Sequence, residues 1–167
     1  MLCYGSKPLV LAYSSVQCFI SLTGKRALVT GGLKGIGKSI ALRLSESGAK
    51  VLVADADPAV NKETASENIS FVECDITEHS QVTETIGKAA GNSGLDFLVN
   101  NAGIFPTTGP IEKVTDEFIT RMFEVNIRAQ FSVSREASKL MNRGGAIVNI
   151  SSIAAISGGA NISAYST

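Results

Sequence analysis

The stretch "TGGLKGIG" (residues 30–37) decides how the rest of the sequence is interpreted. It follows the apolar run "RALVT" (26–30) and leads into a segment where Ile36, Ile40 and Leu44 recur every four residues, as on one helix face. The free amides and the dipole at a helix start attract anions. Glycine-rich turns also occur simply where a helix packs closely on a strand. The strand before this turn and the helix after it favour a dinucleotide-binding site.

Each residue of this turn has an expected role. Gly31 lets the backbone turn sharply off the strand, and Gly35 and Gly37 leave room for a diphosphate. The spacing is G-x-x-x-G-x-G, which differs from the G-x-G-x-x-G of the general fingerprint. We expect the cofactor contacts of this turn to come from Gly31, Lys34, Gly35, Ile36 and Gly37.

The pattern beyond the turn alternates short apolar runs with helical periodicity. Strands are predicted at 26–30, 50–54, 69–73, 95–99 and 146–151, the last after a turn at Gly144–Gly145. Helices are predicted from the glycine turn to Gly48, over about 78–90, and along a face formed by Phe118, Met122, Val125, Ala129, Val133, Ala137 and Leu140. Continuous apolar strands separated by helices are typical of a parallel sheet covered on both faces. We therefore predict a doubly wound α/β domain, Rossmann-like, over residues 22–167 and incomplete at its C-terminal edge.

An acidic residue ends the second predicted strand. Asp55 lies eighteen residues past Gly37, where a carboxylate can accept hydrogen bonds from the adenosine ribose hydroxyls. A carboxylate there would repel the extra phosphate of NADP, which favours NAD. Lys34 argues for the opposite preference, because a cation in the turn could pair with that phosphate, unless it is an ordinary exposed lysine. We expect NAD, with NADP as the alternative.

Composition excludes several classes of protein. Lys plus Arg and Asp plus Glu number 15 each, and no basic cluster indicates nucleic-acid binding. The cysteines, Cys3, Cys18 and Cys74, have neither metal-ligand spacing nor an even count, so we expect no metal site or disulfide framework and a reducing, cytoplasmic compartment. His79, the single histidine, lies in a polar run, and we expect it to be exposed.

The first 21 residues differ from the rest. No charged residue occurs between Pro8 and Gly24, which would suit a signal peptide or an anchor flanked by Lys7. Several serines and a glutamine interrupt the run, and a membrane span needs about 20 mostly apolar residues. We favour a flexible leader or a misassigned start over membrane contact.

Five motifs in order closely resemble the short-chain dehydrogenases/reductases. They are "TGGLKGIG" (30–37), "CDIT" (74–77), "NNAG" (100–103), "VNI" (125–127) and the thirteen-residue interval from Ser152 to Tyr165. The resemblance covers residues 22–167. It implies an oxidoreductase that transfers a hydride between NAD(H) or NADP(H) and a small alcohol or carbonyl substrate, and family members commonly form homo-oligomers.

The resemblance also implies further cofactor contacts. Asp75 matches the acid that contacts the adenine amino group, with Ile76 beside it; a cap for the following helix is the alternative role for Asp75. Asn101, Ala102 and Gly103 match the turn that lies along the cofactor.

Three residues match the family's catalytic positions. Asn126 resembles the asparagine that interrupts the long helix and positions a water, although it could be an ordinary polar helix residue. Ser152 matches the serine that holds the carbonyl oxygen, and Tyr165 matches the acid/base. Hydride reduction of a carbonyl leaves an alkoxide that needs a proton, and a phenol can supply it.

The family's lysine four residues after the tyrosine would be at position 169, beyond the last residue, Thr167. Because that cation lowers the pKa of the phenol, we expect the chain to be the N-terminal part of a family member and inactive alone. A dinucleotide-binding regulatory protein without turnover is the alternative. The substrate remains open, since the segment that builds its pocket would follow Thr167.

Overall fold

The computed structural model describes residues 21–105 and 109–166, so the prediction for a leader at 1–21 lies almost wholly outside the described residues. The described chain forms one parallel sheet in the order β3-β2-β1-β4-β5. Its strands are β1 Arg26–Thr30, β2 Lys50–Asp55, β3 Ile69–Glu73, β4 Leu95–Asn100 and β5 Met141–Asn149. The Rossmann-like α/β fold predicted from the sequence is confirmed.

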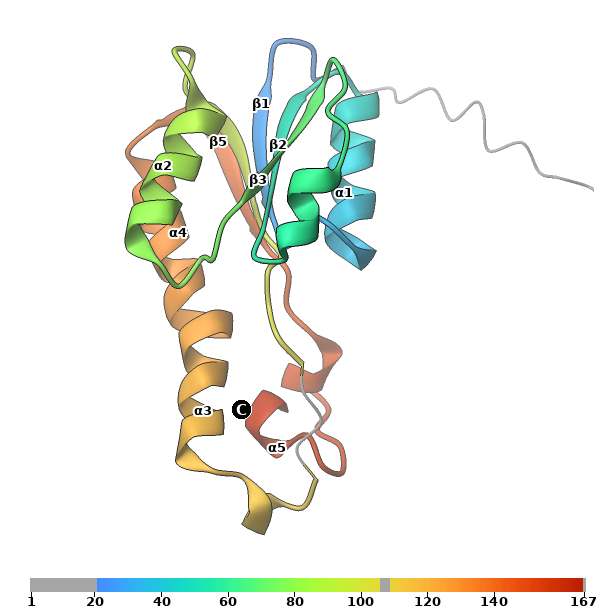
Figure 1. Cartoon of the computed structure of the whole chain (residues 1–167), viewed down its shortest axis with the longest axis vertical. Helices are drawn as coiled ribbons and strands as arrows, with labels where there is room; N and C mark the ends of the chain where they lie inside the picture. Colours follow the sequence, from blue (N-terminus) through green and yellow to red (C-terminus); the bar gives the residue numbers. More distant parts are fainter. Residues whose placement is uncertain (1–20, 106–108, 167) are drawn as a thin grey trace, which may run out of the picture.

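Helices cover both faces of the sheet (Figure 1). One face is covered by α1, and the other by α2 and α4, while α3 and α5 extend beyond the carboxyl edge of the sheet. The helices are α1 Gly35–Glu46, α2 His79–Ala90, α3 Asp116–Phe123, α4 Ala129–Ser138 and α5 Ser163–Ser166. Short 3-10 turns lie at Pro58–Lys62, Ile111–Lys113 and Ile153–Ala155, and a π-helical segment at Glu124–Arg128 joins α3 to α4. Within the described ranges, no helix has the length and apolar character that a membrane span requires.

Alternating strand residues supply two separate cores. Leu28, Leu52 and Leu98 belong to the cluster between the sheet and α2 and α4. Val29, Val53 and Val99 belong to the cluster under α1. Because successive strand side chains point to opposite faces, strands buried on both sides must be apolar throughout, as these are.

The fifth strand differs from the prediction. It begins at Met141 and ends at Asn149, so the predicted range 146–151 is wrong at both ends. Leu95 pairs with Met141 but Phe97 pairs with Ala146, so extra residues of β5 bulge out opposite β4. The predicted turn at Gly144–Gly145 is this bulge, in which Gly144 has a φ of 83°.

Two helix predictions also need correction. Of the stripe predicted on α1, Ile40 and Leu44 are partly buried against the core, but Ile36, at the helix start, is 63% exposed. The fully buried positions of α1 are Gly37 and Ala41. Along the third predicted helix, the buried apolar residues are Met122, Val125, Ala129, Val133 and Ala137. Leu140 follows the end of α4 and is 45% exposed, so it does not belong to that face.

Two turns at the carboxyl edge are bonded to each other. The Thr30 hydroxyl accepts hydrogen bonds from the backbone amides of Asn101 and Ala102, each at 3.1 Å. The Asn101 side-chain amide donates to the carbonyl oxygens of Thr30 (3.1 Å) and Gly31 (2.8 Å). A Cβ at Gly31 would lie 2.7 Å from the Ala102 Cα, and one at Gly37 would lie 2.4 Å from the Asn101 Nδ2. Glycine at both positions allows the two turns to touch.

Replacing Leu98 with alanine should lower the free energy of unfolding by about 2–5 kcal/mol, because the side chain is fully buried between the sheet and two helices. Leu42→Ala is the matched control, since Leu42 is 44% exposed on α1, and we expect it to change stability by less than about 0.5 kcal/mol. Urea denaturation measures both. Equal losses would contradict this assignment of the core.

Gly37→Ala should lower the free energy of unfolding by about 1–3 kcal/mol, because the added methyl group clashes with Asn101 and with the Gly31 carbonyl oxygen. Gly87→Ala should raise it by about 0.5–1 kcal/mol, because Gly87 lies in α2 with no heavy atom within 4 Å of the added carbon. The same substitution in two helices should thus change the free energy of unfolding in opposite directions, which a denaturation experiment measures. A stabilising Gly37→Ala would show that the two turns are not in close contact.

Candidate active site

The start of α1 forms an open cradle of backbone amides. Lys34 is the N-cap residue, but no side chain caps the helix, and its first turn contains no acidic residue. Gly35 has a φ of 55°, and a Cβ built on it would meet no heavy atom within 4 Å. The first amides of α1 therefore remain available to a ligand. These features fit a cofactor diphosphate, which would be held by the backbone at the helix start.

Asp55 lies at the end of β2, as predicted, and is fixed against the glycine-rich turn. Its Oδ2 accepts a hydrogen bond from the Leu33 amide at 3.0 Å, and its Oδ1 accepts one from the Asp57 amide at 3.1 Å. The carboxylate is half-buried beside the turn that would hold the diphosphate. The residues present therefore fit the adenosine half of a dinucleotide.

Lys34 is engaged by a residue that the sequence analysis did not consider. Its Nζ lies 2.8 Å from Oδ2 of Asp57. The hydrogen bond and the charge of Asp57 raise the pKa of Lys34, with a smaller contribution from Asp55, and the Lys34 hydrogen bond lowers the pKa of Asp57. The pattern "DAD" at 55–57, two carboxylates just after a strand, was the sequence signal for this residue.

Asp75 and Ile76 follow β3 along the next stretch of the carboxyl edge. Oδ1 of Asp75 accepts hydrogen bonds from the amide (2.9 Å) and the hydroxyl (2.7 Å) of Thr77. Burial opposes ionisation of Asp75, but the two Thr77 hydrogen bonds and the positive charge of Arg121 outweigh it and lower the pKa of this carboxyl. Ile76 is buried in the core beneath α2 and α4. Asp75 thus holds the turn before α2, while Glu78 occupies the N-cap position of that helix.

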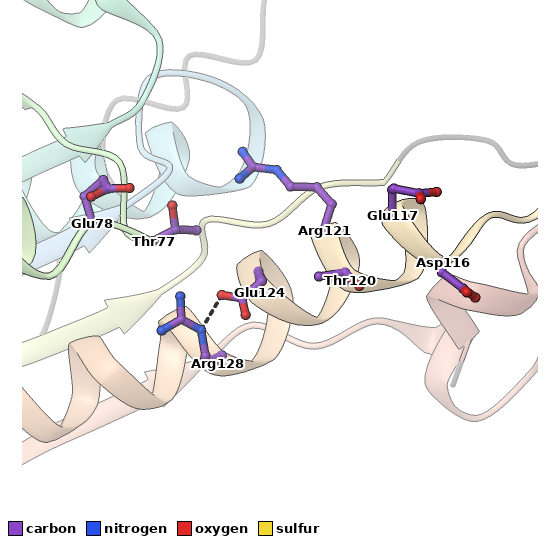
Figure 2. Close-up of a pocket in the computed structure, with 8 residues that line it drawn as sticks. All are labelled: Thr77, Glu78, Asp116, Glu117, Thr120, Arg121, Glu124 and Arg128. Atoms are coloured by element: carbon purple, nitrogen blue, oxygen red, sulfur yellow. Dashed lines mark hydrogen bonds and ion pairs between the residues drawn. The ribbon is translucent and has the colours of Figure 1, made fainter.

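A hollow of about 500 Å³ lies between this turn and α3 (Figure 2). Thr77 and Glu78 line one side of it, and the other side is formed by α3 and the π-helical segment. Arg128 pairs with Glu124 inside it, and Arg121 extends from α3 toward the sheet.

A larger cleft of about 840 Å³ is lined by seven of the fourteen predicted site residues. It is lined by Asn101, Ala102 and Gly103 from the turn after β4, by Ile36 from α1, and by the three predicted catalytic residues, Asn126, Ser152 and Tyr165. The other seven do not line it. Five of these lie in the adjoining turns that Asn101 and Leu33 connect, namely Gly31, Lys34, Gly35, Gly37 and Asp55. The remaining two, Asp75 and Ile76, follow β3. The cleft and the cradle are therefore neighbouring parts of one edge.

Asn126 lies in the π-helical segment, as expected of a residue that interrupts the long helix. Its Oδ1 accepts a hydrogen bond from the Ile104 amide at 2.8 Å, and its Nδ2 donates to the Ile104 carbonyl oxygen at 3.0 Å. The side chain is thus occupied in holding the loop after β4. The wider turn of a π-helix frees backbone carbonyl groups that an α-helix would use, which is common at functional sites.

Ser152 and Tyr165 reach the cleft from separate short elements. Ser152 precedes a 3-10 turn, and its Oγ accepts a hydrogen bond from the Ala154 amide at 3.1 Å. Tyr165 lies in α5, and its ring packs against Phe105 with ring centroids 4.5 Å apart and an interplanar angle of 58°. Phe105 comes from the loop after β4, so it fixes the phenol relative to the turn that contains Gly103.

Asn100, the first residue of the "NNAG" motif, has two polar partners that the sequence analysis missed. The side-chain amide of the buried Asn100 donates to Ser134 Oγ on α4 and to Asn149 Oδ1 on β5, each at 2.8 Å. Ser134 and Asn149 both line the cleft. Their sequence signal is weak, because single polar residues in an apolar strand and in a helix are common.

Charge is absent from the lining of the cleft within residues 21–105 and 109–166. No Lys, Arg, Asp or Glu is among its lining residues. In the same part of the chain, no three His, Cys, Asp or Glu side chains are grouped so that they could hold a metal ion. The hydroxyl groups of its lining belong to Ser134, Ser151, Ser152 and Tyr165.

Comparison with known proteins agrees with this arrangement. The family model described as short chain dehydrogenase matches residues 25–167. The chain is 39% identical over 140 residues to an uncharacterized oxidoreductase of Methylorubrum extorquens, covering 79% of this chain and 56% of the relative. It is 35% identical over 155 residues to (+)-borneol dehydrogenase 2 of Salvia officinalis, covering 87% and 55%.

A solved short chain dehydrogenase from Burkholderia cenocepacia, in complex with NADP, has the same fold. It superposes with a TM-score of 0.79 at 34% identity, covering 87% of this chain and 62% of that one. The chain spans about half the length of the curated relatives it matches. The matched family model, the parallel sheet and the cleft together show that this chain belongs to the short-chain dehydrogenase/reductase family of NAD(P)-dependent oxidoreductases.

Proposed function

We propose that the whole protein transfers a hydride between NAD(H) and a small alcohol or carbonyl compound, and that the described residues form its cofactor side and part of its active site. The observation that carries the proposal is the shared cleft: Asn126, Ser152 and Tyr165 line it together with Gly103. The cradle at Gly35 lies at the same edge of the sheet. A bound cofactor along this edge would supply or accept the hydride.

The two hydroxyl groups have complementary roles in this proposal. The Ser152 hydroxyl holds the oxygen of the substrate, and Tyr165 moves the proton. In reduction, the carbonyl carbon gains a hydride and the carbonyl oxygen gains the proton of the Tyr165 hydroxyl; in oxidation, the phenolate takes that proton back. Phe105 keeps the phenol facing the cleft by contact between the rings.

Asp55 supports a preference for NAD over NADP. Its carboxylate is fixed by the Leu33 and Asp57 amides at the edge of the turn. A carboxylate held there can accept hydrogen bonds from ribose hydroxyls and repels a phosphate. The solved relative from Burkholderia cenocepacia holds NADP, so the fold by itself does not exclude NADP and we assign the preference to local side chains.

A second candidate function is cofactor binding without turnover. A tyrosine acts as an acid/base near neutral pH when a nearby cation lowers its pKa. Among the described residues, no cationic side chain lines the cleft around Tyr165. This observation favours a dinucleotide-binding role for these 167 residues, as either a regulator or one part of a larger enzyme.

Calorimetric titration with NAD⁺ should give saturable binding that Gly35→Ala weakens at least tenfold, because the added methyl group enters the cradle. Gly24→Ala is the matched control. Gly24 also has a positive φ, 80°, and open space around it, but it lies before β1 at the opposite edge of the sheet. Wild-type affinity in Gly35→Ala, or equal losses in both variants, would refute the cradle.

Tyr165→Phe should reduce hydride transfer by about 10²–10⁴-fold without changing NAD⁺ affinity, because it removes the hydroxyl and keeps the ring contact with Phe105. NADH absorbance measures the rate with a panel of ketones and alcohols. Unchanged turnover in Tyr165→Phe would exclude the proposed proton transfer. Binding of NAD⁺ by the wild-type protein without any turnover would instead support the second candidate function.

A further inference from the structure

A closed set of hydrogen bonds connects the glycine-rich turn to the end of β2. Asp55 Oδ2 accepts from the Leu33 amide, and Asp55 Oδ1 accepts from the Asp57 amide. Asp57 Oδ1 accepts from the Ala59 amide at 2.9 Å, and Asp57 Oδ2 accepts from Lys34 Nζ at 2.8 Å. Both oxygens of each carboxylate are therefore engaged, and the orientation of Asp57 toward Lys34 is fixed at the other oxygen by Ala59.

This arrangement determines which charges an extra phosphate would meet. If Asp55 contacts the adenosine ribose, a phosphate on that ribose lies close to Asp55 and to the glycine-rich turn. Lys34 is the cation of that turn, and it is already paired with Asp57. The charge of Asp55 also acts on Lys34, so two carboxylates share one cation. A phosphate would have to approach a net negative group of three side chains.

We propose that Asp57 is a specificity-determining residue that excludes NADP, because it pairs with Lys34 and adds a second negative charge beside Asp55. The proposal rests on the proposed dinucleotide-binding function. It assigns the preference for NAD to the pair of Lys34 and Asp57 together with Asp55, rather than to Asp55 alone. Lys62, in the 3-10 turn after Asp57, also acts on the Asp57 charge and would be a further cation near the site once Asp57 is neutral.

The ion pair is exposed, so its effect is expected to be on selectivity rather than on stability. The Lys34 side chain is 76% exposed and that of Asp57 is 39% exposed. Exposed ion pairs contribute little to folding, because water screens them. A doubly charged phosphate placed between these residues would exclude part of that water and would interact with them more strongly.

Asp57→Asn tests the proposal, because asparagine keeps an oxygen for the Ala59 amide and loses the charge that holds Lys34. The ratio of the NADP⁺ dissociation constant to the NAD⁺ dissociation constant, measured by calorimetry, should fall at least tenfold. In the double variant Lys34→Gln/Asp57→Asn, most of this decrease in the ratio should be absent. Asp57→Ser, which can also cap the 3-10 turn, is a second variant if the first is unstable in a thermal melt.

Glu46→Gln is the matched control. It removes one carboxylate from an exposed ion pair of the same length, 2.8 Å to Arg43, at the far end of α1, and it should leave the ratio unchanged. A ratio within twofold of wild type in Asp57→Asn, with NAD⁺ binding intact, would overturn the role of Asp57 and leave the proposed function standing. An equal decrease of the ratio in the single and the double variant would overturn the role of Lys34. Absence of binding to either nucleotide in the wild-type protein would overturn the proposed function, and this inference with it.

Discussion

The hydrogen bonds between Thr30 and Asn101 are the constraint on which the rest of the site depends. The strand order 3-2-1-4-5 makes β1 and β4 neighbours although two other strands separate them in sequence. Their following turns leave the sheet on opposite faces, as is usual where a doubly wound sheet changes direction, and a crevice forms between them. The Asn101 amide bridges that crevice at its base through the carbonyl oxygens of Thr30 and Gly31. The start of α1 and the cleft are therefore held in one fixed relation.

Much of the fold can be predicted from short apolar runs, because strands that are buried on both faces must be apolar throughout. The first four strands match their predicted ranges to within one residue, because each is a short apolar run bounded by polar or glycine residues. The fifth strand does not, because its first half contains an asparagine, an arginine and two glycines, and it pairs with β4 only through a bulge. Such a segment has no apolar periodicity that could distinguish a strand from a turn.

The site shows the same division between what sequence can and cannot predict. Asn126, Ser152 and Tyr165 are far apart in sequence but line one cleft, as the family resemblance implied. Their catalytic roles remain predictions. The contacts around them could not be foreseen, because Asn126 binds the backbone of Ile104 and Tyr165 packs on Phe105, and neither pairing has a spacing rule. For Lys34, the sequence suggests either a partner for the NADP phosphate or an ordinary exposed lysine. The structure instead pairs it with Asp57, a contact that neither interpretation includes.

The central claim is that a dinucleotide lies across the carboxyl edge between β1 and β4. Amide chemical-shift mapping of the ¹⁵N-labelled protein with NAD⁺ tests it most directly. The account predicts shifts in residues 31–37, 55–57 and 101–103, with none around Gly91 at the opposite edge of the sheet. Shifts confined to the hollow of Figure 2 or to the amino edge, or no shifts at millimolar NAD⁺, would contradict it.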